Sequence, residues 1–320
     1  MRDGGFTIVS RRHGRGRGPA MTAARASATK GFAYRSSLTT GATAEAANAD
    51  EAIRLRVSAA VDEMRSSPFY AALLGRLRRL SPFGSIVCLG VGRFASTRSA
   101  RYQLALAFLL RDDLLAERAP AGIGSGDGHG CIQHDDTVRD LGARPGGESS
   151  DDDGRLHIFD PALDEAELAF VRQQTRTRLR LRNEEGRVAM CGRSLYMLLH
   201  CSRVLYSNLL EANWGAARLP HIAVLGNSFC ALAEAPLVSR ADRESTAGWC
   251  RVTRAAPLVT EESCDTLGGG RASDFDHAFN NTSLHTFDAA VMPPPDDALW
   301  TRPFSDPPRG GGAGVEALLD

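Results

Sequence analysis

Eleven residues have the types and positions expected of a small-ligand site. They are glycines, hydrogen-bonding residues and one arginine, and most of them stand where a short apolar run ends. In chain order they are Gly90, Gly92, Arg101, Asp160, His200, Cys201, Asn227, Ser228, Asn280, Ser283 and His285. The carboxyl ends of parallel strands meet at one edge of a sheet, and ligands of open α/β sheets bind there. We therefore predict ligand binding by these residues and assign no catalytic residue and no metal ligand.

The turn Gly90-Val91-Gly92 supplies half of a dinucleotide-binding fingerprint, because Ala95 stands where a third glycine is expected. A tight turn explains two glycines at this spacing at least as often as phosphate contact does. The helix that follows would still offer unpaired amide donors to an anion, and Arg98 or Arg101 could assist. Asp160 ends a second apolar run, where Rossmann-type folds hold a ribose hydroxyl, although Asp-Pro is also a common turn.

Cys201 could act as a thiol nucleophile if a histidine served as its base. His200 precedes it directly, and adjacent side chains on an extended strand point to opposite faces. A buried structural thiol is therefore the favoured interpretation of Cys201. Haem coordination by His200, Cys201 or His285 is a weaker alternative, because such ligands work only in a prepared pocket. The cofactor stays unassigned, with a nucleotide-like molecule and haem as the two ligand candidates.

The composition excludes several classes of protein. The 320 residues are 43% hydrophobic and 24% charged, as is ordinary for a globular protein, and their formal net charge of zero gives no reason to expect a nucleic-acid partner. No apolar stretch reaches the roughly 18 residues of a membrane-spanning helix. Seven scattered cysteines without a C-x-x-C pair argue against structural zinc and disulfides, and favour a reducing compartment.

The chain divides into one α/β domain with three irregular segments. Residues 1–48 form an Arg-rich extension that reads as a disordered tail or a transit-like targeting segment, and 303–320 form a disordered tail. The domain covers 49–302 and carries a low-complexity insertion at 119–154. His129, Cys131 and His134 lie in that insertion, where a solvated loop offers no rigid frame for a metal.

Apolar runs and helical periodicities alternate through the domain. The predicted strands cover 86–89, 155–160, 179–182, 194–199 and 221–225, with a further strand at 251–259. The predicted helices cover 50–80 in two pieces, about 97–115, 164–174 and 202–214. This alternation predicts a Rossmann-like three-layer α/β sandwich with a mainly parallel sheet.

Several blocks of the sequence resemble a known family. These blocks are IVCLGVGRF, ARYQLALAFLL, IFDPALDEAE, HCSRVLYSNLLEANWG, IAVLGNSF and AFNNTSLHTF. They are similar, in order across most of residues 51–300, to the SRR-like family, named for Sensitivity to Red Light Reduced. The Arg-rich extension and the Gly/Asp-rich insertion depart from the family pattern, which leaves localisation and partner contacts open.

The resemblance implies a regulatory protein with protein partners, in the cytoplasm and nucleus; the Arg-rich extension indicates an organelle as the alternative. Plant members are tied to circadian-clock input and light signalling, and fungal and animal relatives to the regulation of haem biosynthesis. A small ligand bound at the strand ends is one means by which such a protein would work. No established reaction comes with the family, so an uncharacterised Rossmann-like enzyme acting on a nucleotide-like or cofactor substrate remains the alternative.

Overall fold

A computed structural model describes residues 44–115, 154–234, 246–264 and 274–301. The predicted insertion, the C-terminal tail and nearly all of the N-terminal extension lie outside these ranges. The first helix begins at Ala44, inside the expected extension.

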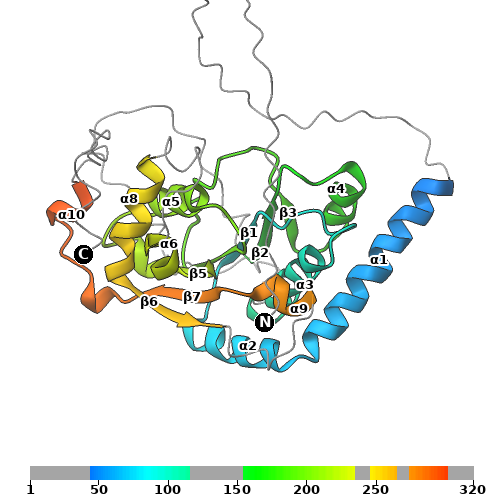
Figure 1. Cartoon of the computed structure of the whole chain (residues 1–320), viewed down its shortest axis with the longest axis horizontal. Coiled ribbons are helices and arrows are strands. Elements are labelled where there is room, and N and C mark those ends of the chain that lie inside the picture. Colours follow the sequence, from blue (N-terminus) through cyan, green and yellow to red (C-terminus); the bar gives the residue numbers. More distant parts are fainter. Residues whose placement is uncertain (1–43, 116–153, 235–245, 265–273, 302–320) are drawn as a thin grey trace, which may run out of the picture. The chain divides into compact units, whose positions relative to one another are not determined.

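The described residues form an α/β fold around a seven-stranded, mainly parallel sheet, as predicted (Figure 1). The strands are β1 (Ser85–Leu89), β2 (Arg155–Phe159), β3 (Thr177–Leu179), β4 (Ser194–Leu198), β5 (Ile222–Asn227), β6 (Val259–Ser263) and β7 (Thr282–Phe287). Their order in the sheet is β3-β2-β1-β4-β5-β7-β6. The first five are parallel, while β7 runs antiparallel to both β5 and β6.

Helices cover both faces of this sheet. They are α1 (Ala44–Arg65), α2 (Pro68–Leu80), α3 (Arg98–Leu114), α4 (Glu165–Arg172), α5 (Arg203–Ala212), α6 (Phe229–Glu234), α8 (Thr246–Ala255), α9 (Asp274–Phe279) and the short α10 (Ala298–Thr301). Figure 1 shows α5, α6 and α8 grouped together, apart from α1 and α3. Side chains cap two of these helices: Ser67 caps α2, and Asp164 makes a capping box with Glu167 at α4.

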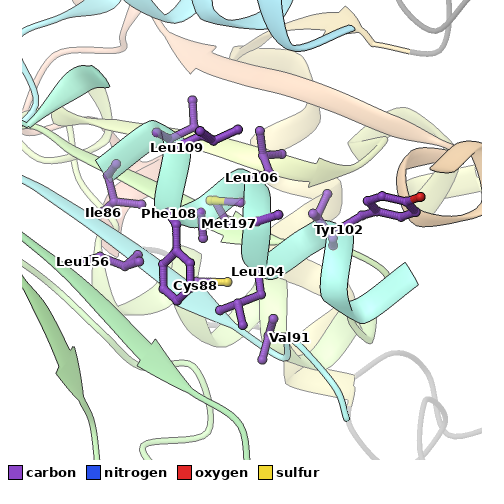
Figure 2. Close-up of a cluster of buried hydrophobic side chains, with 14 of the residues drawn as sticks. Ile86, Cys88, Val91, Tyr102, Leu104, Leu106, Phe108, Leu109, Leu156 and Met197 are labelled. Atoms are coloured by element: carbon purple, nitrogen blue, oxygen red, sulfur yellow. The ribbon is translucent and has the colours of Figure 1, made fainter. Parts of the chain in front are cut away.

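Side chains from the two faces of each central strand pack into two separate apolar cores. Along β1, Ile86 and Cys88 pack with α1, α2, α3 and α9, whereas Val87 and Leu89 pack with α5 and α8. This alternation follows from the two-residue repeat of a strand, and burial on both faces explains why the run is apolar throughout. In the first core, side chains of α3 such as Phe108 meet Cys88 and Leu156 from the sheet (Figure 2). These cores hold the sheet rigidly, so the positions of the strand ends are fixed.

The prediction of a strand at 251–259 was wrong over most of its length. Residues up to Ala255 belong to α8, and β6 begins only at Val259. Val252 and Ala255 are both fully buried and three residues apart, which is the spacing of a helix face and not of a strand. Strand β7 was not predicted, because polar residues interrupt its sequence.

Candidate functional site

The candidate site lies where two neighbouring strands lead into helices on opposite faces of the sheet. Strands β1 and β4 are neighbours and parallel, yet β1 leads into α3 on one face and β4 leads into α5 on the other. In open α/β sheets this topological switch point leaves a crevice outside the carboxyl ends of the strands. Gly90 and Gly92 follow β1 here, and His200 and Cys201 follow β4, so these strand ends converge as predicted.

Cys201 fits directly against the glycine turn. Its Sγ lies 3.4 Å from the carbonyl oxygen of Leu89, to which it donates, and a Cβ added to Gly90 would lie 2.7 Å from it. Gly90 also has a φ of +71°, a region that favours glycine. Burial, followed by the nearby Asp160, raises the pKa of Cys201 to about 12. The structure thus gives Cys201 the properties of a packed thiol and not those of an activated nucleophile.

Asp160 ties the end of β2 to the glycine turn. Its Oδ2 accepts the Gly92 amide hydrogen at 2.6 Å, and its Oδ1 accepts that of Ala162 at 2.7 Å. Farther along the turn, the fully buried Glu167 accepts the Ala95 amide hydrogen at 2.8 Å. Carboxylates of the chain itself therefore occupy the places that a phosphate or ribose would take in a dinucleotide site, so the geometry gives Asp160 a structural role.

Tyr206 joins the ends of β4 and β5. Its buried hydroxyl accepts the Asn227 amide hydrogen at 2.6 Å, lies 2.9 Å from Oδ1 of Asn227 and donates to the carbonyl of Leu198. A Cβ on Gly226 would approach that hydroxyl to 2.5 Å, so glycine is required there. Burial raises the pKa of Tyr206 well above its ordinary value. Sequence reasoning placed Tyr206 in the family blocks but gave it no role.

Ser228 and His285 meet at Glu261, a residue that sequence reasoning missed. Oε2 of Glu261 accepts the amide hydrogens of Phe229 and Cys230 at 3.0 and 3.1 Å, and lies 3.6 Å from Nε2 of His285. Burial alone would raise the pKa of Glu261, but hydrogen bonds from His285, Ser228 and the Cys230 amide outweigh it and hold that pKa far below its usual range.

His285 lies inside the sheet and not at its rim. It is fully buried, pairs with Val224 in mid-strand and stacks on the Phe229 ring at a centroid distance of 4.0 Å. Its Nδ1 lies 3.0 Å from the Val224 carbonyl oxygen, which can only accept, so Nδ1 carries a hydrogen. His285 therefore belongs to the packing of β5, β7 and α6.

The remaining predicted residues are spread along the same edge. His200 is exposed, and its Nε2 lies 3.1 Å from the Ala278 carbonyl oxygen, which also accepts from Gln103. Asn280 is exposed in the turn before β7, and Ser283 is buried opposite Gly226. Together with Asn227, they place polar groups around the carboxyl ends of β4 and β5.

Arg101 stands apart from the crevice, at the start of α3. Its Nε donates to the Phe94 carbonyl at 3.0 Å and its Nη2 to the Ala95 carbonyl at 3.3 Å. Burial, then the nearby Arg56 and Arg98, lower the pKa of Arg101. The predicted residues therefore form one cluster at the switch point, a neighbouring one around Glu261 and a separate basic group.

A cavity of 530 Å³ lies at the opposite edge of the sheet, where the strands begin. Its lining residues are Ser81, Pro82, Phe83, Asp112, Asp113, Leu114, Leu115 and Arg176. None of them is a predicted site residue, and their acids are engaged: Tyr70 and Arg78 contact Asp113, while Arg111 pairs with Asp112. We therefore centre the candidate site on the switch point, which is where the fold gathers polar groups from several connections.

Within the described ranges, no group of three or more His, Cys, Asp or Glu residues is arranged to hold a metal ion. The metal-ligand types at His129, Cys131 and His134 lie outside those ranges. Among the residues that the structure describes, no helix is long and apolar enough to cross a membrane.

These features define a doubly wound α/β domain with its polar residues gathered at the switch point. The SRR1 domain matches residues 71–286, and the chain belongs to this family, as the sequence blocks indicated. The protein SENSITIVITY TO RED LIGHT REDUCED 1 of Arabidopsis thaliana is 25% identical over 251 residues, which cover 75% of this chain and 76% of that protein.

Two animal relatives are also similar. An SRR1-like protein of Drosophila melanogaster is 25% identical over 249 residues, covering 75% of this chain and 70% of the relative. An SRR1-like protein of Mus musculus is 28% identical over 149 residues, less than half of either chain. No solved structure matches the chain.

Proposed function

We propose that this protein is a regulator whose switch-point edge binds a small ligand and whose bound state is recognised by protein partners. The observation that carries the proposal is that β1, β4 and β5 end side by side, with the exposed polar side chains of His200 and Asn280 at these strand ends. Parallel strands hold these groups, and the strand ends at a switch point are where ligands of this fold class bind.

The biological setting that we propose is based on the relatives of this chain. The Arabidopsis relative bears a name that refers to sensitivity to red light, and its alignment spans three quarters of both chains. We propose a related role in light signalling and circadian-clock input, with regulation of haem biosynthesis as a further output. Cytoplasm and nucleus are the proposed compartments, with an organelle as the alternative; microscopy of the full chain tagged at its C-terminus distinguishes the two.

A catalytic role has less support from the geometry. An enzyme acting on a nucleotide-like or cofactor substrate would need an activated group at the edge, but the raised pKa of Cys201 keeps its thiol protonated. Asn227 is engaged with Tyr206, and Ser228 with Glu261. Both polar side chains therefore already form hydrogen bonds within the protein in the absence of a substrate.

Thermal unfolding of the full chain with saturating ATP, NAD, S-adenosylmethionine or haemin tests the proposal. A ligand that binds only the native state must raise the melting temperature, and we expect one of these probes to do so. The shift should shrink in His200→Asn, because His200 is exposed at the edge and asparagine tolerates its φ of +54°. The matched control is His221→Asn, an exposed histidine just before β5 at the opposite edge, which should keep the full shift. The absence of any shift with all four probes would reject ligand sensing.

A further inference from the structure

A group of arginines gathers beside the start of α3 and comes from two different helices. Arg56 of α1 and Arg101 of α3 donate to the same acceptor, the Ala95 carbonyl oxygen, at 3.2 and 3.3 Å. Arg98 precedes Arg101 by one helical turn, so the two lie on the same side of α3. Two guanidinium groups that share one carbonyl oxygen lie close enough together for a single oxyanion to bridge them.

Among the described residues, the positive charges of Arg56 and Arg101 have no carboxylate partner. Glu63 is the carboxylate next to this group, with Oε2 3.7 Å from Nη2 of Arg98 and 2.6 Å from the Tyr102 hydroxyl. Burial is the main cause that lowers the pKa of Arg101, and the neighbouring charges of Arg56 and Arg98 lower it further.

Other arginines of the same region pair with carboxylates, which sets Arg56 and Arg101 apart. Arg93 pairs with Asp164 and with the buried Glu167, and Arg54 pairs with Asp50. The first turn of α3 contains no acid, although helix N-termini favour acidic residues. The amide donors of the glycine turn already have carboxylate acceptors, so an incoming anion would meet the arginine side chains instead.

We infer that Arg56, Arg98 and Arg101 bind a phosphate monoester. A guanidinium group presents several N–H donors in a plane and suits phosphate oxygens better than an ammonium does. Arg101 is held in place by the Phe94 and Ala95 carbonyls, while the Arg98 side chain is 57% exposed and contacts Glu63 and the Tyr102 hydroxyl. This site stands apart from the switch-point residues, so the inference goes beyond the proposed function.

Calorimetric titration of the full chain tests the inference with three phosphate probes and two controls. The probes are inorganic phosphate, AMP and a blocked Ala-phosphoserine-Ala tripeptide; the controls are adenosine and the unphosphorylated tripeptide. We expect the phosphate-bearing probes alone to bind, and to bind more tightly at pH 7.5 than at pH 5, because the second phosphate pKa is about 6. Tighter binding of AMP than of inorganic phosphate supports a nucleotide as the source, and tighter binding of the phosphopeptide supports a phosphorylated protein.

Charge variants then locate the site. Arg56→Gln and Arg98→Gln should each weaken phosphate binding about tenfold, the loss expected for one charge-assisted hydrogen bond. Glu63→Gln should strengthen it about two- to fivefold by removing an exposed opposing charge. Arg65→Gln is the matched control, because Arg65 is also exposed on α1 but lies near Tyr70, away from the group.

Two results would overturn the inference. One is failure of all three phosphate probes to bind; the other is equal binding by wild type, Arg56→Gln and Arg98→Gln. The outcome is separable from that of the proposed function, because stabilisation by haemin or S-adenosylmethionine without phosphate binding would refute the arginine site and leave ligand sensing intact. Phosphate binding that His200→Asn does not affect, with no thermal shift from NAD, S-adenosylmethionine or haemin, would support the arginine site alone.

Discussion

Gly90 and Cys201 are packed so closely that the Sγ of Cys201 occupies the space a Cβ on Gly90 would need, at 2.7 Å. The two residues come from the ends of different strands, so this contact sets how near the β1 and β4 connections approach each other. The close approach of the two connections thus depends on the absence of a side chain at Gly90 and on a small thiol at Cys201.

Replacing Gly90 by alanine should therefore lower the free energy of unfolding for two reasons, which can be measured separately. One is the left-handed backbone, and the other is overpacking against Cys201. Gly192 has nearly the same φ, +70° against +71°, but nothing lies within 4 Å of its added Cβ. Gly192→Ala should cost about 1–2 kcal/mol from the left-handed backbone alone. Gly90→Ala should cost about 1–3 kcal/mol more through overpacking against Cys201.

Urea denaturation of both variants measures this difference. The double variant Gly90→Ala/Cys201→Ala should regain most of the additional loss, because it removes the obstructing sulfur. Equal costs for Gly90→Ala and Gly192→Ala would show that Cys201 does not pack against the turn.

The hydroxyl of Tyr206 should contribute more to the free energy of unfolding than the hydroxyl of Tyr102 does. Tyr206→Phe leaves the Asn227 amide hydrogen and the Leu198 carbonyl without their buried partner, which costs about 1–3 kcal/mol of unfolding free energy. Tyr102→Phe is the control, since its hydroxyl contacts Glu63, whose side chain is 52% exposed and can turn to water. A Tyr206→Phe protein as stable as Tyr102→Phe in the same denaturation experiment would contradict the role we give to this hydroxyl.

The parallel part of the fold was readable from the sequence because each central strand is a short apolar run closed by glycine or polar residues. The run Ile86–Leu89 is buried on both faces, so its sequence needs no alternation. The edge strand β3 was placed two residues late, because its exposed side chains carry little periodic signal. Strand β7 was missed, since His285 is polar and its burial depends on partners from β5 and β6 that local sequence does not reveal.

The candidate site was predictable only in its location. Parallel strands bring their carboxyl ends together, so the meeting of Gly90 with Cys201 follows from topology. The partners of Asp160 and Glu261 do not follow, because the Gly92 and Phe229 amides stand 68 and 32 residues away in sequence. Which carboxylates satisfy backbone donors, and which arginines stay uncompensated, is decided by tertiary packing.

Glu261 should make the fold sensitive to acid. Its folded-state pKa is lower than in the unfolded chain, so it stabilises the fold above the pH where an unfolded glutamate titrates, and this contribution is lost as pH falls toward the folded pKa. Stability measured from pH 7 to pH 3 should fall in wild type and fall less steeply in Glu261→Gln. Glu262→Gln is the control, because Glu262 pairs with Arg76 at the surface and accepts no amide hydrogen from α6. Identical acid profiles for Glu261→Gln and wild type would refute this role.

Cysteine labelling tests the structural interpretation of Cys201. Burial raises the pKa of both Cys88 and Cys201, whereas Cys191 is exposed. Because the thiolate is the reactive form, iodoacetamide at pH 7.5 should modify Cys191 quickly and reach Cys88 and Cys201 only after unfolding in urea. Peptide mass spectrometry at timed intervals gives each rate, and the exposed Cys230, whose pKa is also raised, should fall between these extremes. Labelling of native Cys201 as fast as that of Cys191 would mean an accessible thiolate at the switch point, and the enzyme alternative would then gain the activated group that the present geometry withholds.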